Sequence, residues 1–170
     1  ITGDPLLVES FISGDDVHRR TASQIFSCAP DEVDKAKRDV GKLVNFATIY
    51  GQGATALGQI IGVKRGEAQS YIDGYFEAYA GVRRWLDDII AESHSMGFVN
   101  TLFGRRRYIP ELSSRAFAER QAGERIAANT PIQGSAADLC KQAMIDIDAE
   151  ILLTFDTHGD HHATEQRSIQ

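Results

Sequence analysis

The chain is 170 residues long, with 42% hydrophobic and 25% charged residues. These values are ordinary for one soluble globular domain with a real core. The sequence has no apolar run long enough to span a bilayer and does not open with a signal peptide, so we expect no membrane partner and a cytoplasmic location. Its net charge of −6 excludes a uniformly basic nucleic-acid binder.

Positive charge is nevertheless concentrated in two segments. Residues 35–42 carry four cations against one aspartate, and residues 101–125 carry six arginines against three glutamates. A globally acidic protein can therefore still present a basic face. Cys28 and Cys140 lack metal-type spacing and are expected to be reduced thiols. Because the chain begins at Ile1 and not at Met, we expect it to be a piece of a longer protein.

The first helical pattern follows a short apolar segment at residues 6–12. The polar run Ser13–Asp16 predicts a cap for a helix from about Val17 to Phe26. His18 lies in the first turn of this helix, where it could reach an anionic ligand. A lone histidine at such a position is more often an ordinary solvated residue, so the pattern alone leaves both interpretations open.

The central helix is predicted to begin after Asp34, which is expected to cap it, and it carries an unusual row of side chains. Arg38, Lys42, Phe46 and Tyr50 are spaced four residues apart, which places them on one face of a helix. Two cations followed by two aromatic rings suit a ligand with phosphates at one end and a planar base at the other. An amphipathic helix with a solvated basic end remains the plainer alternative.

Further elements follow the glycine-rich run at residues 51–53. We expect a short helix over residues 52–62, then helices over 64–79 and 82–94 whose aromatic and aliphatic stripes face a core. Residues 97–102 and 105–109 have the pattern of a small β-hairpin.

The last predicted elements are two helices separated at a proline. Ser113 or Ser114 is expected to cap a helix that reaches Asn129, and Thr130 followed by Pro131 predicts the start of a second helix. The residues expected to form the buried side of this second helix are Ala136, Ala137, Leu139, Cys140, Ala143, Met144, Ile147 and Ile151.

The order of these motifs resembles one known family. Arg-x3-Lys-x3-Phe-x3-Tyr-Gly over residues 38–51 is similar to the nucleotide-binding helix in the fingers of family A DNA polymerases, the bacterial DNA polymerase I type. Gly-Asp-Asp-Val-His over residues 14–18 resembles the segment before that helix. Gly-Arg-Arg at 104–106 and the run from Glu124 to Gly134 resemble later segments. The resemblance holds from about Gly3 to about Ile151.

The resemblance implies roles for five residues near the nucleotide. In the family, counterparts of His18, Arg38 and Lys42 contact the phosphates of the incoming dNTP. The counterpart of Phe46 packs on its sugar and base, and that of Tyr50 lies beside the templating position. We carry these roles over as expectations.

The resemblance also implies contacts with primer–template DNA by Arg105, Arg106, Arg125, Asn129 and Gln133. Asparagine and glutamine suit the minor groove because its acceptors are similarly placed in all four base pairs. From the sequence alone, Gln133 is nearly as well explained as a capping-box partner of the predicted second helix.

The family uses Mg²⁺ held by two aspartate motifs, and neither motif is found in this sequence. No catalytic residue or metal ligand is therefore assigned, and the chain alone is predicted to be inactive. The His/Asp-rich run from His158 to His162 invites comparison with a zinc site, but a polar terminal tail is more often disordered. We accordingly divide the chain into residues 1–151, fingers and partial palm, and residues 152–170, a non-family tail.

We therefore predict a mainly α fold, with one small hairpin and flanking palm helices but without the catalytic palm strands. The expected function is that of a DNA polymerase fragment, whose partners are primer–template DNA, an incoming dNTP and the remainder of the polymerase. Two alternatives stay open: a non-catalytic helical nucleic-acid-binding module, and a structural helical domain without a ligand.

Overall fold

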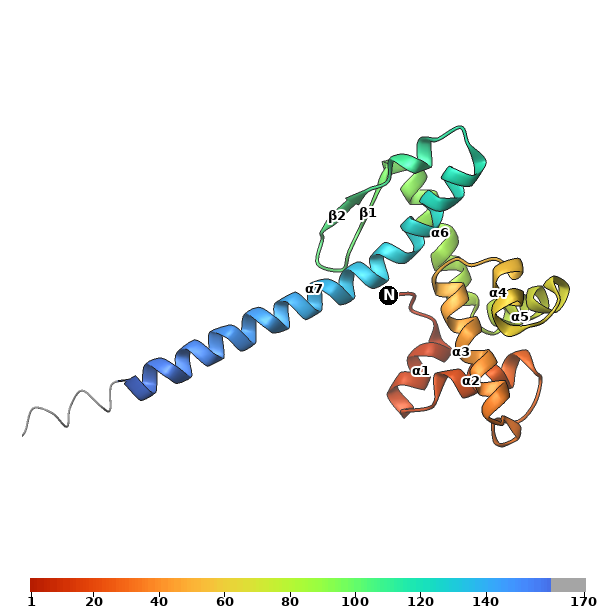
Figure 1. Ribbon diagram of the computed structural model, residues 1–170, viewed down its shortest axis with the longest axis horizontal. Coiled ribbons are helices and arrows are strands. Elements are labelled where there is room, and N and C mark those ends of the chain that lie inside the picture. Colours follow the sequence, from red (N-terminus) through yellow and green to blue (C-terminus); the bar gives the residue numbers. More distant parts are fainter. Residues whose placement is uncertain (160–170) are drawn as a thin grey trace, which may run out of the picture.

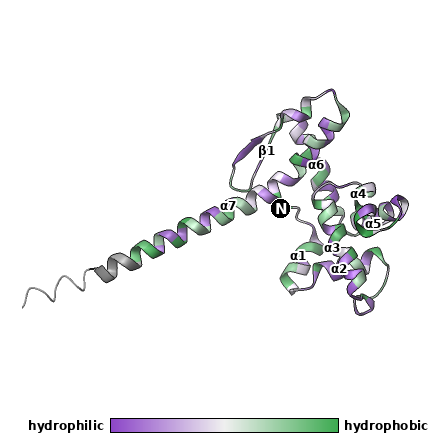
Figure 2. Cartoon of the chain, viewed as in Figure 1, coloured by the Kyte–Doolittle hydropathy of each residue, from purple (hydrophilic) through white to green (hydrophobic). Residues whose placement is uncertain are grey.

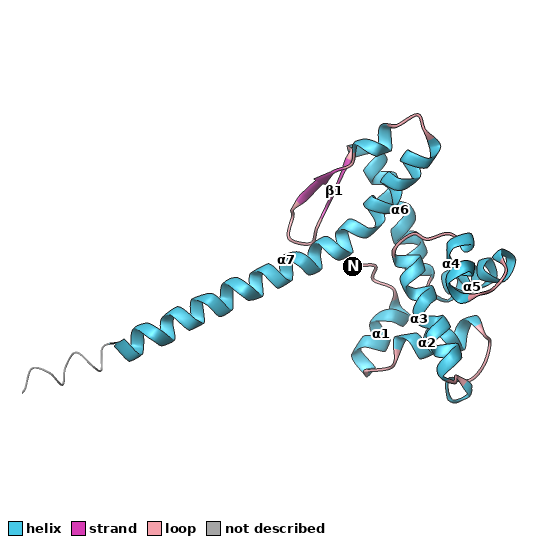
Figure 3. Cartoon of the chain, in the orientation of Figure 1, coloured by secondary structure: helices cyan, strands magenta, loops and turns pink. Residues whose placement is uncertain are grey.

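The computed structural model describes residues 1–159, and the side chains of residues 1–153. This part of the chain is mainly helical, with seven α-helices, two short 3-10 helices and one antiparallel hairpin. The helices α1–α5 gather into one lobe, α6 leads from it to the hairpin, and α7 projects away from both (Figures 1 and 3). The predicted mainly α fold with a small hairpin is confirmed.

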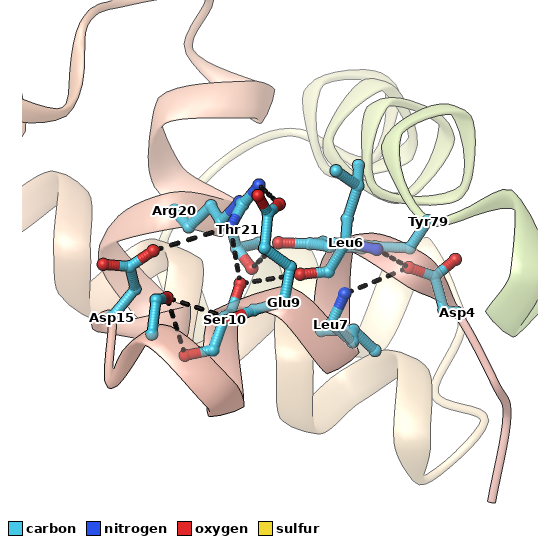
Figure 4. Close-up of polar contacts among 10 residues, drawn as sticks. Asp4, Leu6, Leu7, Glu9, Ser10, Asp15, Arg20, Thr21 and Tyr79 are labelled. Carbon is cyan, nitrogen blue, oxygen red and sulfur yellow. Dashed lines mark hydrogen bonds and ion pairs between the residues drawn. The ribbon is translucent and has the colours of Figure 1, made fainter.

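The segment that the sequence showed only as apolar is helix α1, Pro5–Ser13. Asp4 caps it by accepting hydrogen bonds from the Leu6 and Leu7 amides at 3.1 and 3.2 Å (Figure 4). The second carboxylate oxygen of Asp4 accepts from the Gly81 amide at 2.8 Å. Asp4 thus ties the beginning of α1 to that of α6, and only 2% of it is exposed.

A second polar contact joins α1 to α2, Val17–Ile25. Arg20 donates to Glu9 at 2.6 Å and to the buried Ser10 hydroxyl at 3.0 Å (Figure 4). Asp16 caps α2, as predicted, through hydrogen bonds from the amides of its first turn.

The central helix is α3, Lys35–Ile49, and it packs extensively on α2. Asp34 accepts a hydrogen bond from the Lys37 amide at 2.8 Å, which confirms its predicted role as the cap. The 3-10 helix η1, Pro30–Glu32, connects α2 to this cap.

The lobe is completed by α4, Ala54–Ile61, and α5, Arg65–Ala78. Its core draws buried side chains from α3, α4 and α5, together with residues at the beginning of α6, Ala80–Met96. The members of this core are Val44, Ala47, Ala54, Leu57, Ala68, Ile72, Tyr75, Tyr79 and Val82. The helices predicted over residues 52–62, 64–79 and 82–94 are therefore confirmed.

A second, smaller core lies under the hairpin. Strands β1, Phe98–Asn100, and β2, Arg106–Tyr108, pair antiparallel, with Val99 opposite Arg107. The 3-10 helix η2, Pro110–Ser113, follows. The buried members of this core are Val99, Ile109, Leu112 and Ala127.

The predicted separation of two helices at Thr130–Pro131 is wrong. Helix α7 runs from Phe117 to Gly159, with Pro131 inside it. The Thr130 hydroxyl does not cap a new helix, because it donates back to the Ile126 carbonyl at 2.6 Å. The Ser135 hydroxyl donates in the same way to the Pro131 carbonyl and also accepts from the Leu102 amide at 2.8 Å. Side-chain hydrogen bonds and the docked hairpin thus hold the helix together on both sides of the proline.

The buried side predicted for residues 136–151 is also wrong. All of the named side chains are exposed, including Leu139 at 61% and Met144 at 69%. Hydrophobic residues recur along this projecting part of α7 (Figure 2). The periodic pattern predicts the helix correctly, but it does not say which element would pack on its apolar side. No other element of the described residues packs on that side. The helix also passes the boundary predicted at residue 151, and residues 160–170, with most of the His/Asp-rich run, lie outside the described part.

Candidate nucleotide and nucleic-acid site

The four-residue row on α3 lies on an accessible face of the helix, as its spacing predicts. Lys42 is exposed, Arg38 is half-buried, and Phe46 and Tyr50 are 42% and 39% exposed. The Lys42 Nζ atom lies 5.9 Å from the centroid of the Phe46 ring, and the Phe46 and Tyr50 centroids are 6.5 Å apart. The row therefore runs as a continuous strip from two cations to two rings.

Arg38 is held in place by the residue that caps α2. Its Nε donates to one carboxylate oxygen of Asp16 at 2.5 Å, while the other oxygen accepts from the His18 and Arg19 amides. The hydrogen bond from Arg38 is the main reason that the pKa of Asp16 lies below its ordinary value, and the hydrogen bonds from the helix amides lower this pKa further. Within residues 1–153, whose side chains are described, only Nε of this guanidinium is engaged, so its outer nitrogens can bind an anion.

His18 lies beside the row, with its ring centroid 5.9 Å from that of Phe46. Asn45 Nδ2 lies 3.2 Å from His18 Nδ1. Burial of the ring is the main reason that the pKa of His18 is lowered; the cations Arg38 and Lys42 add to the effect, and Asp16 opposes it. The rings of His18 and Phe46 both line a mainly apolar cavity of about 340 Å³ between α1, α2, α3 and α5.

The far end of the row contacts α7. The Gln133 Nε2 donates to the Tyr50 hydroxyl at 3.0 Å. Gly51 has a φ of 62°, and a Cβ atom added there would lie 3.0 Å from Cγ of Arg125. The structure thus brings Tyr50 together with Gln133 and Arg125, which lie about 80 residues later in the sequence.

A second cavity, of about 390 Å³, opens next to Tyr50. Its polar lining comes from Tyr50, Arg107, Arg125 and Asn129. The Asn129 Oδ1 atom is buried and has no hydrogen-bond partner in the structure. An unpaired acceptor is costly to bury, so this atom indicates a donor that the described residues do not supply.

The hairpin arginines differ in what they contact. Arg105 donates to Asp138 at 2.7 Å and to the Gly134 carbonyl at 3.2 Å, which joins the hairpin to α7. Arg106 points to the other face, where its guanidinium carbon lies 3.9 Å from the Phe98 ring centroid. Of the two, Arg106 is the one not engaged by a carboxylate.

Two residues of the site were not identified from the sequence. Asp16 was interpreted only as a helix cap, and no sequence signal shows that it also holds Arg38. Arg107, which lines the second cavity, could have been found, because alternation along a strand puts residues 105 and 107 on one face and 106 on the other.

The described residues offer no obvious metal centre. No group of three or more His, Cys, Asp or Glu side chains among them is placed to hold an ion. No described helix is both long and apolar enough to cross a membrane.

The chain matches known proteins over most of its length. Residues 1–161 match the family DNA polymerase family A. The chain is 47% identical over 151 residues to DNA polymerase I of Bacillus subtilis and 43% identical to that of Deinococcus radiodurans, covering 89% of this chain but only 17% and 16% of those proteins. It is also similar to the polymerase domain of Pol1 from M. smegmatis, solved with DNA primer–template and dNTP, at 40% identity and a TM-score of 0.84, covering 90% of this chain and 27% of the other. The chain therefore belongs to DNA polymerase family A.

Proposed function

We propose that this chain supplies the nucleotide-binding fingers and part of the primer–template contact of a DNA-directed DNA polymerase. The observation that carries the proposal is the exposed row on α3, with two cations at one end, two rings at the other and His18 beside it. The solved relative with DNA and dNTP makes these two ligands the natural candidates.

The phosphates of a dNTP would lie at the cationic end of the row. Arg38 has its outer nitrogens available, Lys42 adds a compact charge, and His18 offers a further polar group. The exposed face of Phe46 would pack on the sugar and base, and Tyr50 would lie next to the template. The length of the row, three steps of four residues on a helix, spans roughly 18 Å. This is enough for a triphosphate and a base.

DNA contacts would be made by Arg106, Arg125, Asn129 and Gln133, with Arg107 now added because it lines the same cavity as Asn129. The buried Asn129 oxygen is an acceptor without a partner among the described residues, and a donor such as the guanine amino group in the minor groove would satisfy it. Arg105 would act indirectly, because its contacts with Asp138 and Gly134 fix the hairpin on α7.

Mg²⁺ belongs to the proposed activity of the whole enzyme and not to the described residues. Family A polymerases generally use this ion, but the described side chains contain no carboxylate cluster that fits it. We therefore derive no chemical step for this chain and propose only binding. Nucleotide addition to a primer 3′ end is proposed for the longer protein.

Isothermal titration calorimetry with a deoxynucleoside triphosphate tests the nucleotide site. We expect weak binding that falls roughly tenfold or more in Lys42→Ala, since a charge-assisted contact contributes about 1.5–3 kcal/mol. Lys64→Ala removes the same charge from an exposed lysine before α5 and is expected to bind like wild type. Equal affinities for wild type and Lys42→Ala would contradict the proposal.

The alternative function is a nucleic-acid-binding module without a nucleotide site, for which the Arg107–Asn129 cavity is the supporting observation. Fluorescence anisotropy with primer–template DNA measures the DNA binding that both predict, and calorimetry with the triphosphate separates the two. A module of that kind binds DNA but gives no heat with a triphosphate, whereas the proposed fingers give both signals.

A further inference from the structure

A chain of buried hydrogen bonds leads from the core of the lobe to the ring of His18. The Tyr79 hydroxyl lies 3.2 Å from Thr21 Oγ1, which lies 3.2 Å from Asn45 Oδ1. On its other side, Asn45 Nδ2 lies 3.0 Å from the Gly41 carbonyl oxygen and 3.2 Å from His18 Nδ1. Thr21 and Tyr79 are fully buried and Asn45 is 5% exposed, so water does not compete for these groups.

The Gly41 carbonyl determines which way the Asn45 amide faces. Turning the amide over would place two acceptor oxygens 3.0 Å apart, so the nitrogen must face Gly41. Thr21 Oγ1 lies 3.2 Å from Oδ1, to which its hydroxyl donates, and 3.0 Å from Nδ2. Nδ2 therefore faces three acceptors, the Gly41 oxygen, Thr21 Oγ1 and His18 Nδ1, and its two protons are shared among them.

A donor facing His18 Nδ1 constrains the histidine ring. A proton on Nδ1 would oppose a proton of the Asn45 amide across 3.2 Å, whereas a bare Nδ1 accepts it. We propose that Asn45 is a positioning residue that holds His18 as the neutral tautomer with its proton on Nε2, so that Nε2–H donates to a phosphate oxygen of the bound nucleotide. The phosphate part of this inference rests on the proposed nucleotide site, and the tautomer part does not.

The charges around the ring agree with a neutral His18. Burial lowers the pKa of the ring, Arg38 and Lys42 lower it further, and Asp16 opposes them. A neutral ring with a fixed tautomer donates one hydrogen bond in one direction. Arg38 and Lys42 would neutralise the charge of the phosphates, while the single hydrogen bond from His18 would fix the orientation of the phosphate group.

Long-range ¹H–¹⁵N spectra of the full chain, labelled at histidine, test the tautomer without any ligand. The signal that disappears in His18→Gln identifies the ring. We expect wild type to show an Nε2–H tautomer and Asn45→Asp to change it to Nδ1–H, because a carboxylate accepts where the amide donated. Ser23→Ala removes a different, partly buried hydrogen bond of α2, from Ser23 Oγ to the Cys28 carbonyl, and is expected to keep the wild-type tautomer. An Nδ1–H tautomer in wild type, or no change in Asn45→Asp, overturns the inference.

A double-mutant cycle tests whether Asn45 acts through His18. Asn45→Leu adds no charge and is expected to weaken triphosphate binding about three- to tenfold, whereas in a His18→Gln background it is expected to have no further effect. A merely structural role would reduce affinity by the same factor in both backgrounds, and that result overturns the positioning role. If wild type binds no triphosphate, the proposed nucleotide site and the phosphate contact fail together, and the spectra still decide the tautomer.

Discussion

The hydrogen bond from Gln133 to the Tyr50 hydroxyl, 3.0 Å long, joins the end of α3 to α7. Tyr50 was predicted to belong to the nucleotide site, beside the templating position, and Gln133 to contact DNA; here the two side chains contact each other. A glutamine bound in this way is not a capping-box partner, since α7 does not begin at Thr130. The pair would therefore have to separate, or share its polar groups, when a base pair occupies the cavity beside Tyr50.

We expect the Tyr50–Gln133 pair to contribute about 0.5–1 kcal/mol to stability, because both side chains are partly exposed. Urea unfolding of Tyr50→Phe, Gln133→Leu and the double variant gives this coupling as a double-mutant cycle. Tyr50→Phe combined with Gln142→Leu, which removes an amide that donates to Asp146 on α7, is the matched control and is expected to be additive. Additive effects for Tyr50→Phe and Gln133→Leu would mean that the bond does not form in solution.

The Asp16–Arg38 contact predicts a stability difference that depends on pH. The folded pKa of Asp16 is below its ordinary value, chiefly through the hydrogen bond from Arg38. The contribution is therefore complete above the unfolded pKa, about 3.9, and is lost as the pH falls through the lower folded value. Asp16→Asn keeps a good helix cap but loses the charge, so it should be less stable than wild type at neutral pH. We expect the difference to vanish near pH 2.

Chemical denaturation at several pH values measures this effect. Asp16→Ala removes the cap as well and is expected to lose about 1 kcal/mol more than Asp16→Asn at every pH. A difference between wild type and Asp16→Asn that is constant from neutral to acidic pH would show that Arg38 does not hold the carboxylate.

The sequence was sufficient for helices α2–α5 of the lobe and for the row of side chains on α3, but it did not show that residues 5–13 form a helix. Four-residue spacing determines which residues share a helix face, and caps such as Asp34 are local signals. The positions of Arg38, Lys42, Phe46 and Tyr50 followed from these two rules. Contacts between distant segments, such as Tyr50 with Gln133, did not follow, because nothing local encodes them.

The two wrong predictions for α7, the break at Pro131 and the buried side, also depend on contacts between distant segments. Pro131 is normally a sign that a helix begins or ends. In this chain, hydrogen bonds of Thr130 and Ser135 to backbone carbonyls, together with the docked hairpin, keep the helix continuous. The apolar stripe over residues 136–151 predicted a buried face, but periodicity does not say which element covers it.

The contact between Asp4 and Gly81 predicts that an alanine at position 81 is destabilising. A Cβ atom there would lie 2.7 Å from Asp4 Oδ2 and 2.9 Å from its Cα, and Asp4 is buried with three hydrogen bonds. We expect Gly81→Ala to cost about 1–3 kcal/mol by overpacking. Gly66→Ala, also in a helix but with no atom near its added Cβ, should gain up to about 1 kcal/mol from helix propensity. Thermal unfolding of both variants decides this, and a stabilising Gly81→Ala would refute the contact.

Primer extension by the 170-residue chain is expected to stay at background, even with saturating primer–template DNA, dNTPs and Mg²⁺ or Mn²⁺. Phosphoryl transfer of this kind depends on metal ions held by carboxylates on a rigid platform. Three of the carboxylates already have structural partners: Asp4 binds the helix amides of α1 and α6, Asp16 binds Arg38, and Asp138 binds Arg105.

The decisive measurement is extension of a labelled primer by wild type and by Lys42→Ala, with an intact family A polymerase as the positive control. Traces of a contaminating polymerase would extend the primer equally in both preparations, because the substitution does not affect them. Extension that needs a divalent ion and disappears in Lys42→Ala would contradict the expectation. It would mean that carboxylates such as Asp146 and Asp148, exposed on α7, assemble with the row on α3 once DNA is bound.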